Sequence, residues 1–431
     1  QNTAARPRRT PLLPARAGEP PRPPPPRAAP HATTMHHAHT AGLGVALLVG
    51  MAVTATAFRT GGARSSRMAV DLTPAVERLP RIPGAAAGAL LDDDRVLVRR
   101  GGAAPTSEDP FKLVKEDLVP FSDNMKELVE TDNPVLTQAA KLFFEQRHGK
   151  RFRPTLVALM SKATLPEVDE VTYAKQGQLG QITEMIHVAS LIHDDVLDEA
   201  DTRRGGLAVH KLYSNKVAVL AGDFLLARAS VLLARLNHLD VVELMASALD
   251  SLVQGELLQV RSTEADLVDL QAYLRKSYYK TASLVCNSCK SAALLAGYGF
   301  DDPVASIAEQ YGYHLGLAYQ VVDDILDLTG VQHVLGKPAL ADMSLGLATA
   351  PILYAMEREP KLKPIIQRRF KKEGDKEVAY EAAMSTDAIE RSYELAEWHA
   401  QQAVDAVMKL PPSPHRTALV AIAHIVLNRD K

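Results

Sequence analysis

The sequence predicts an all-α protein, and two observations support this prediction. From Pro110 onward, apolar residues recur at three- and four-residue spacing, as in Val217, Leu220 and Phe224, which is the period of an amphipathic helix. The alternation of apolar and polar residues that is typical of a β-strand is scarce in the same region. We therefore expect one all-helical domain over residues 110–431.

The segment before this domain differs from it in composition. Residues 1–70 resemble a targeting leader, in which an apolar, signal-like stretch over 35–57 precedes an Arg-containing, acid-free, transit-like stretch over 58–70. Residues 71–109 are rich in Gly and Ala and predict a flexible connector. A signal followed by a transit peptide resembles the leaders of algae with secondary plastids, so we expect a plastid location. A mitochondrial presequence and a membrane anchor remain as alternatives.

Charge and cysteine content exclude some classes of function. The net charge is -2, so there is no general basic field to attract nucleic acid. The two cysteines, Cys286 and Cys289, have a C-x-x-C spacing that suits a redox pair or half of a zinc site. A zinc site would need two further ligands nearby, and none is present. We favour the third interpretation, two thiols packed inside a helix.

Two Asp-Asp-x-x-Asp clusters are the main functional signal. Their acids are Asp194, Asp195 and Asp198 in the first cluster and Asp323, Asp324 and Asp327 in the second. On a helix, the first and last acids of a cluster share a face, and the middle one points about 100° away. Both clusters lie in apolar sequence, where like carboxylates repel one another unless a cation neutralises them. Ligands that are all oxygen predict Mg²⁺, which binds one or two carboxylates together with waters and phosphates.

Basic residues alternate with the acidic clusters along the chain. They are Lys150 and Arg153 before the first cluster, Arg203 and Arg204 directly after it, and Lys280 and Lys337 on either side of the second. Arginine suits bidentate contact with phosphate, and lysine acts as a point charge. This pattern predicts a site for two diphosphates, one bridged by Mg²⁺ and the other held directly by Lys and Arg.

The order of these motifs resembles that of the trans-isoprenyl diphosphate synthase family, which elongates prenyl chains head to tail. The resemblance runs from about Phe111 to the C-terminus and includes Gly149–Pro154, both Asp clusters, and Gly336-Lys337-Pro338. It is greatest for the long-chain, solanesyl type of plastids and cyanobacteria. The resemblance implies a single large helical bundle of the isoprenoid synthase type with a central active-site cavity.

The family also implies ligands and partners. The substrates are expected to be isopentenyl diphosphate and an allylic diphosphate (geranyl, farnesyl or geranylgeranyl), the cofactor Mg²⁺, and the product a long all-trans polyprenyl diphosphate for quinone side chains. We further expect a homodimer, peripheral membrane association for product release, and no nucleic acid partner.

The resemblance assigns roles to individual residues. Isopentenyl diphosphate is expected to bind four of them, Lys150, Arg153, His187 and Arg204. The allylic diphosphate is expected to contact five, Arg203, Lys280, Thr281, Gln320 and Lys337. All six aspartates are expected to bind Mg²⁺. The catalytic set is expected to be Lys280, Gln320, Asp194 and Asp323, and no protein nucleophile is needed, because the allylic bond ionises and the double bond of isopentenyl diphosphate attacks the resulting cation.

Small residues before the first cluster predict a long product. Ala189 and Ser190 lie about one helical turn before Asp194, where farnesyl-making relatives have an aromatic side chain that closes the tunnel. Ile186 lies another turn before Ser190 and is expected to form a deeper part of the tunnel wall. The alternative is that Ala189 and Ser190 only pack against a neighbouring helix.

Four other functions share some of these features. A terpene cyclase would have one Asp-rich cluster but not the Lys150–Arg153 pair, and a squalene or phytoene synthase would have different acidic motifs. An inactive regulatory subunit of a hetero-oligomeric synthase would have lost acids that are all present here. A geranylgeranyl diphosphate synthase remains as an alternative within the family.

Overall fold

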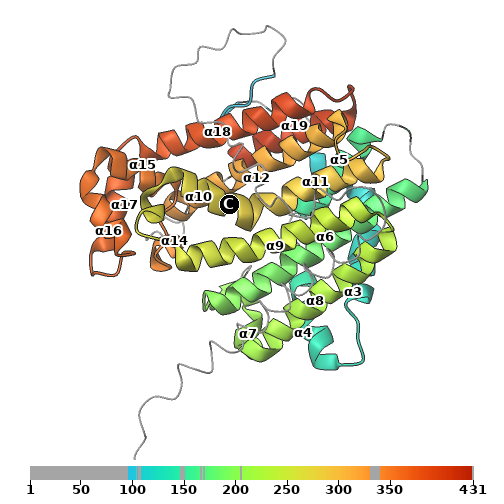
Figure 1. Cartoon of the computed structure of the whole chain (residues 1–431), viewed down its shortest axis with the longest axis horizontal. Helices are drawn as coiled ribbons and strands as arrows, with labels where there is room; N and C mark the ends of the chain where they lie inside the picture. The colour runs from blue at the N-terminus through green and yellow to red at the C-terminus, as the bar shows by residue number, and fades with distance from the viewer. Residues whose placement is uncertain are drawn as a thin grey trace, which may run out of the picture.

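The computed structural model describes residues 96–102, 104, 108–145, 151–165, 167, 170–203, 206–330 and 340–429. Three predicted site residues, Lys150, Arg204 and Lys337, lie outside these residues, as does the predicted leader 1–70. Almost all of the described chain is helical (Figure 1). The predicted all-α, isoprenoid synthase-type fold is confirmed by this architecture and by the similar structures reported below.

The first half of the domain contains nine helices and a short hairpin within the described residues. They are α2 (Pro110–Leu113), α3 (Lys115–Leu128), α4 (Pro134–Glu145), α5 (Phe152–Thr164), α6 (Glu170–Leu197), β1 (Thr202–Arg203), β2 (Gly206–Leu207), α7 (Val209–Leu212), α8 (Asn215–Leu236), α9 (Leu239–Arg261) and the 3₁₀ helix η1 (Asp266–Val268). The antiparallel pairing of β1 with β2 is the only strand pair in the described part of the chain.

The second half begins with α10 and ends at the C-terminal helix. Its elements are α10 (Leu270–Ser277), the π-helix η2 (Tyr278–Ala282), α11 (Ser283–Leu295), α12 (Pro303–Thr329), α14 (Ala341–Ser344), α15 (Ala350–Arg358), the 3₁₀ helix η3 (Pro360–Leu362), α16 (Lys363–Gln367), α17 (Asp375–Ser385), α18 (Ala388–Val407) and α19 (Pro414–Leu427). Short π-helical segments inside α-helices are frequent at functional sites.

Helix α12 lies at the centre of the bundle, packed against α11 and α18 (Figure 1). It begins at Pro303, where the Asp302 side chain accepts a hydrogen bond from the Val304 amide and caps the helix. Gly316 permits close packing, because a Cβ there would lie 2.6 Å from Cα of Ala282. The glycine therefore brings the π-helix η2 directly against the helix that bears the second Asp cluster.

Helices α6 and α8 pack together along the first cluster. Gly222 on α8 makes this possible, since a Cβ there would lie only 2.2 Å from Nε2 of His193. The same His193 nitrogen lies 3.2 Å from the carbonyl oxygen of Val219. The residue directly before Asp194 is thus fixed against α8.

The segment before the helical domain includes a packed stretch. Val98 is buried, and its amide donates to Oε1 of Gln401 on α18 at 2.9 Å. The Arg100 guanidinium lies 3.7 Å from the centre of the Tyr393 ring on the same helix. Residues 96–101, which belong to the predicted flexible connector, therefore lie along α18.

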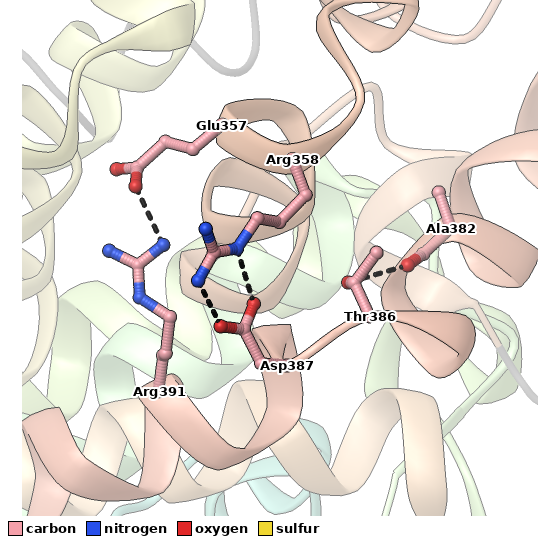
Figure 2. Close-up of polar contacts among 6 residues, drawn as sticks. All are labelled: Glu357, Arg358, Ala382, Thr386, Asp387 and Arg391. Carbon is pink, nitrogen blue, oxygen red and sulfur yellow. Dashed lines mark hydrogen bonds and ion pairs between the residues drawn. The ribbon is translucent and has the colours of Figure 1, made fainter.

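Exposed ion pairs connect α15 to α18 on one side of the bundle. Figure 2 shows Arg358 forming a two-bond contact with Asp387, with Nε to Oδ1 at 2.9 Å. Beside it, Arg391 Nη1 donates to Glu357 Oε2 at 2.6 Å. These contacts lie in solvent, where such pairs contribute little to stability.

The two cysteines lie on α11, and both are free and buried. Burial raises the pKa of the Cys289 thiol to about 12, so it remains protonated at neutral pH. This placement agrees with the interpretation of two packed thiols.

Candidate active site

The first Asp cluster occupies the last turn of α6, and its three acids differ in surroundings. Asp195 is only 1% exposed, and its Oδ1 accepts hydrogen bonds from Arg203 Nε at 2.7 Å and Nη2 at 2.5 Å. Arg203 comes from β1, so the hairpin that follows α6 folds back to bring this partner to the cluster. Asp194 and Asp198 share the other face of the helix. The buried acid therefore supports the helix end, and the other two are available to a ligand.

Opposite Asp194 lies Lys280, at the middle of the π-helix. Its Nζ lies 2.6 Å from Oε1 of Glu256 and donates to Oε1 of Gln259 at 3.1 Å, both on α9. Burial lowers the pKa of Lys280, but Glu256 and Asp194 outweigh burial and hold the pKa above its usual value. The lysine is therefore fully charged, as a contact for diphosphate requires.

The surroundings of the Asp194 carboxyl group oppose its ionisation. Burial and the neighbouring Glu256 raise its pKa to about 8, even though Lys280 and Arg203 act in the opposite direction. Burial raises the pKa of Asp198 in the same way. A further cation between these carboxylates would remove the repulsion.

The second Asp cluster lies near the end of α12. Asp324 is 4% exposed and accepts from the Tyr273 hydroxyl at 2.6 Å and from Gln320 Nε2 at 2.7 Å. Asp327 accepts from the backbone amides of Ala341 at 3.2 Å and Asp342 at 3.3 Å. Again the middle acid is buried among protein donors, and Asp323, with a side chain that is 56% exposed, lies outermost.

Two further charged residues belong to this second cluster. Burial and Asp327 raise the pKa of Asp342 to about 7. Burial lowers the pKa of Lys276, against the influence of Asp324 and Asp342. Among the described residues, the second cluster therefore has four carboxylates against two cations, Lys276 and the Arg429 that pairs with Asp323, and it too is short of positive charge.

Two of the four predicted isopentenyl diphosphate residues, Arg153 and His187, meet near the start of α5. Arg153 Nη1 lies 3.0 Å from Nε2 of His187 on α6, and Lys150 and Arg204 are outside the described residues. Nearby, the centre of the Phe152 ring lies 5.1 Å from the centre of the Tyr319 ring, and the Arg429 guanidinium lies 3.8 Å from the centre of the Tyr319 ring. Arg429 also donates to Oδ1 of Asp323 at 3.0 Å. The basic end of the site therefore adjoins the second cluster.

A pocket with about 750 Å³ of open space, part of it continuous with solvent, lies between α6, α8 and α9. These three helices are neighbours in the bundle (Figure 1). Asp194, Glu256 and Lys280 line its polar part. Ile186 and Leu249 line the apolar part, and they lie eight and seven residues before Asp194 and Glu256, or about 12 and 10 Å along their helices. The pocket is therefore polar at one end and apolar at the other.

The three predicted chain-length residues have different positions relative to this pocket. Ser190 and Ile186 line it, together with Leu226 of α8. Ala189 is fully buried and is not among the lining residues. Since adjacent helical residues point about 100° apart, only one member of the Ala189-Ser190 pair faces the pocket.

The donor set fits a divalent cation bound with its own waters and phosphates. Every candidate ligand is a carboxylate oxygen, and Oδ2 of Asp195 is buried without a hydrogen-bond partner among the described residues. In the described part of the chain, no three Asp, Glu, His or Cys side chains converge on one closed metal site. Mg²⁺ commonly takes only one or two carboxylates and completes its shell with water and phosphate, so open clusters of this kind suit it.

Sequence reasoning missed six residues of this site. They are Glu256, Gln259, Tyr273, Lys276, Asp342 and Arg429. Glu256 continues the helix face of Leu249, Leu252 and Val253, at positions i, i+3, i+4 and i+7. An acid on such an apolar face could have indicated a pocket. Tyr273 and Arg429 contact the second cluster from 51 and 106 residues away in sequence, and no local pattern marks them.

The family comparison agrees with this geometry. Residues 133–383 match the family model described as polyprenyl synthetase. The chain belongs to this family. The predicted family and enzyme class, a trans-polyprenyl diphosphate synthase, are therefore confirmed.

Individual relatives in the polyprenyl synthetase family are similar over most of the chain. One is the mitochondrial solanesyl-diphosphate synthase 1 of Oryza sativa subsp. japonica, 42% identical over 79% of this chain and 84% of the relative. Another is the chloroplastic/mitochondrial solanesyl diphosphate synthase 3 of Arabidopsis thaliana, 42% identical over 75% of this chain and 81% of the relative.

A solved structure supports the fold and the class of ligand. The polyprenyl synthase of Caulobacter crescentus, complexed with calcium and isoprenyl diphosphate, has a TM-score of 0.68 at 30% identity, covering 75% of this chain and 97% of that one. Members of this family use divalent metal ions and isoprenyl diphosphate substrates.

Proposed function

We propose that this polyprenyl synthase adds isopentenyl diphosphate head to tail to an allylic diphosphate and makes an all-trans product of about solanesyl length, for a quinone side chain. The observation that supports it best is the pocket, in which Asp194, Glu256 and Lys280 lie at one end and an apolar lining extends between α6, α8 and α9. A diphosphate suits the charged end, and a growing hydrocarbon suits the apolar walls.

Two groups of charged and polar residues would bind the two substrates. Lys280, Arg203, Thr281 and Gln320, with Lys337, would contact the allylic diphosphate. Arg153 and His187, which lie 3.0 Å apart, would bind isopentenyl diphosphate with Lys150 and Arg204. The proposed metal is Mg²⁺, held by the six aspartates with Asp194, Asp198, Asp323 and Asp327 outermost. When bound, Mg²⁺ would neutralise the carboxylates and favour loss of the diphosphate.

The protein groups stabilise charge during the reaction. Lys280 and Arg203 would stabilise the negative charge on the departing diphosphate while the allylic carbon–oxygen bond breaks. The double bond of isopentenyl diphosphate then attacks the allylic cation, and a proton leaves to the released diphosphate. The apolar walls exclude water, which would quench the cation.

The decisive test is chain growth by the purified full chain. Labelled isopentenyl diphosphate and farnesyl diphosphate should give long products only when Mg²⁺ is present. Asp194→Asn should lower turnover about 10²- to 10³-fold, because it removes a group that supports charge stabilisation in the transition state. No Mg²⁺-dependent growth would favour a regulatory subunit, and a product that stops at geranylgeranyl diphosphate would favour that synthase.

Chain length can be tested with adjacent residues. Ser190→Phe should shorten the product, because Ser190 lines the pocket. Ala189→Phe is the matched variant, since Ala189 is fully buried away from the lining; it should lower stability by about 1–3 kcal/mol through overpacking. Product chromatography and thermal unfolding of both variants separate the two effects, and an unchanged product from Ser190→Phe would contradict the tunnel assignment.

We also propose a homodimer that covers the outer face of α8. Helix α8 has the length and mean hydropathy of a membrane span, 1.9, but half of that stretch is buried within the bundle. On its outer side, Leu220 and Val231 are 51% and 47% exposed and lie three turns apart on one face. Light scattering should show a dimer for the native chain and a smaller species for Leu220→Glu combined with Val231→Glu.

The cellular location is proposed to be a plastid, with a mitochondrion as the alternative, and product release is proposed to involve transient contact with a membrane. The support is the leader pattern of residues 35–70. Fusing residues 35–95 to a fluorescent protein would distinguish the two organelles, and co-sedimentation of the full chain with lipid vesicles would test the membrane contact.

A further inference from the structure

Tyr273 has a buried hydroxyl that contacts the second Asp cluster. The residue lies on α10, is 4% exposed, and donates to Oδ2 of Asp324 at 2.6 Å. Asp324 is equally buried. A hydrogen bond between two buried side chains restricts both of them, because neither can exchange its partner for water.

A chain of hydrogen bonds continues from Asp324 to the π-helix. The other oxygen of Asp324, Oδ1, accepts from Gln320 Nε2 at 2.7 Å. Gln320 Oε1 in turn accepts from the Thr281 hydroxyl at 2.5 Å. Thr281 directly follows Lys280, which lines the polar end of the pocket. The network therefore connects α10 to the place where the reaction is proposed to occur.

This network determines which end of the Gln320 side chain faces Asp324 and which end faces Thr281. Gln320 presents its NH₂ group to Asp324, which is the orientation that an ionised carboxylate requires, because it only accepts hydrogen bonds. Its carbonyl oxygen must then point the other way, toward Thr281. A carbonyl oxygen beside a carbon that becomes positive stabilises that charge, whereas an NH₂ group would oppose it.

We propose that Tyr273 is a positioning residue, which holds Asp324 so that the Gln320 carbonyl is fixed toward the reacting allylic carbon. The proposal rests on the proposed function, since it needs an allylic cation next to Gln320. It gives Asp324 a role in orienting Gln320 that is separate from metal binding. Tyr273 itself touches neither substrate nor metal in this assignment.

The test uses two phenylalanine variants of the full chain. Tyr273→Phe removes the hydroxyl that contacts Asp324. Tyr311→Phe is the matched control, because Tyr311 is also fully buried, and its hydroxyl donates to the Leu419 carbonyl at 2.8 Å, away from the acidic clusters. Both variants lose one buried hydrogen bond, so both should lower the melting temperature.

Only Tyr273→Phe should change catalysis. We expect kcat to fall about tenfold or more while KM for both substrates stays within about twofold, which is the result of losing an interaction made in the transition state. Tyr311→Phe should keep kcat within about twofold of the wild type. Equal kcat in the two variants would overturn the proposal. If wild-type protein shows no chain growth, the proposed function fails instead.

Two further measurements test the route through Gln320. Adding Tyr273→Phe to Gln320→Ala should cause no further loss of kcat, because the two residues act as one unit.

Mn²⁺ binding to the substrate-free protein, followed by electron paramagnetic resonance, should be the same for Tyr273→Phe and wild type. Weaker Mn²⁺ binding, with kcat restored by excess metal, would overturn the proposal and make Tyr273 a support for a metal ligand. Should Tyr273→Phe unfold at the assay temperature, kcat of Tyr273→Phe and Tyr311→Phe is compared at a lower temperature at which both variants stay folded.

Discussion

The first Asp cluster is held by an arginine, whereas the second is held mainly by neutral donors. Asp195 is paired with Arg203 of the β1–β2 hairpin, and Asp324 accepts from Tyr273 and Gln320. In both clusters the helical rotation buries the middle acid. The neighbouring element then decides whether a charge or a hydroxyl and an amide stabilise it. Because of this difference, the two clusters should respond differently to substitution.

The largest effect on stability is expected from Arg203→Ala. It leaves the buried Asp195 carboxylate without its partner, and since Arg203 itself is about a third exposed, we expect a loss of about 2–4 kcal/mol, less than a fully buried pair would lose. The loss is measured as the change in the free energy of unfolding in urea. The double variant with Asp195→Asn should recover part of the loss, because no buried charge then remains. A double variant as unstable as Arg203→Ala would show that the ion pair is not the cause.

Gly222→Ala tests how the first cluster is supported from α8. The added Cβ would lie 2.2 Å from Nε2 of His193, so the ring next to Asp194 must move. We expect a loss of about 1–3 kcal/mol by overpacking, measured by thermal unfolding. Gly177→Ala is the control, because a Cβ there meets nothing within 4 Å. Equal losses in both variants would point to a general backbone effect.

A buried histidine on α12, the helix that bears the second cluster, should make the free energy of unfolding depend on pH. His314 on α12 lies 3.0 Å, Nδ1 to Nδ1, from His399 on α18, and burial lowers the pKa of His314 to about 4. The unfolded chain binds this proton near pH 6.5 but the folded chain does not, so stability falls as the pH drops from about 6.5 toward 4. One histidine gives a slope of at most about 1.4 kcal/mol per pH unit. His314→Gln should flatten the slope measured by urea unfolding, and an unchanged slope would exclude His314 as its source.

The smallest effect is expected from Arg429→Gln, the counterpart of Arg203→Ala at the second cluster. Arg429 pairs with Asp323, whose side chain is 56% exposed, so water replaces the lost partner. Since Arg429 also stacks on Tyr319, the ion pair is isolated by a double-mutant cycle with Asp323→Asn in urea unfolding. We expect the pair to contribute less than about 1 kcal/mol, and less still at high salt. A loss as large as that of Arg203→Ala would remove the contrast between the two clusters.

Several features of this protein follow from its sequence alone. Helix periodicity and the spacing of both Asp clusters depend on residues within a few positions of one another, so the all-α class and the family could be predicted. The same local geometry implied that the middle acid of each cluster would differ from its neighbours. The roles of Lys150, Arg204 and Lys337 stay predictions, because these residues lie outside the described part of the chain.

Tertiary packing alone decided the remaining features. Ser190 rather than Ala189 lines the pocket, because the positions of α8 and α9 determine which side of α6 is left open. Tyr273 reaches Asp324 across 51 residues of sequence, and Glu256 reaches Lys280 from a different helix. These contacts depend on how whole helices pack, and packing is set by the summed burial of many side chains. The aspartates therefore mark the site in the sequence, and the folded chain selects the residues that hold them in place.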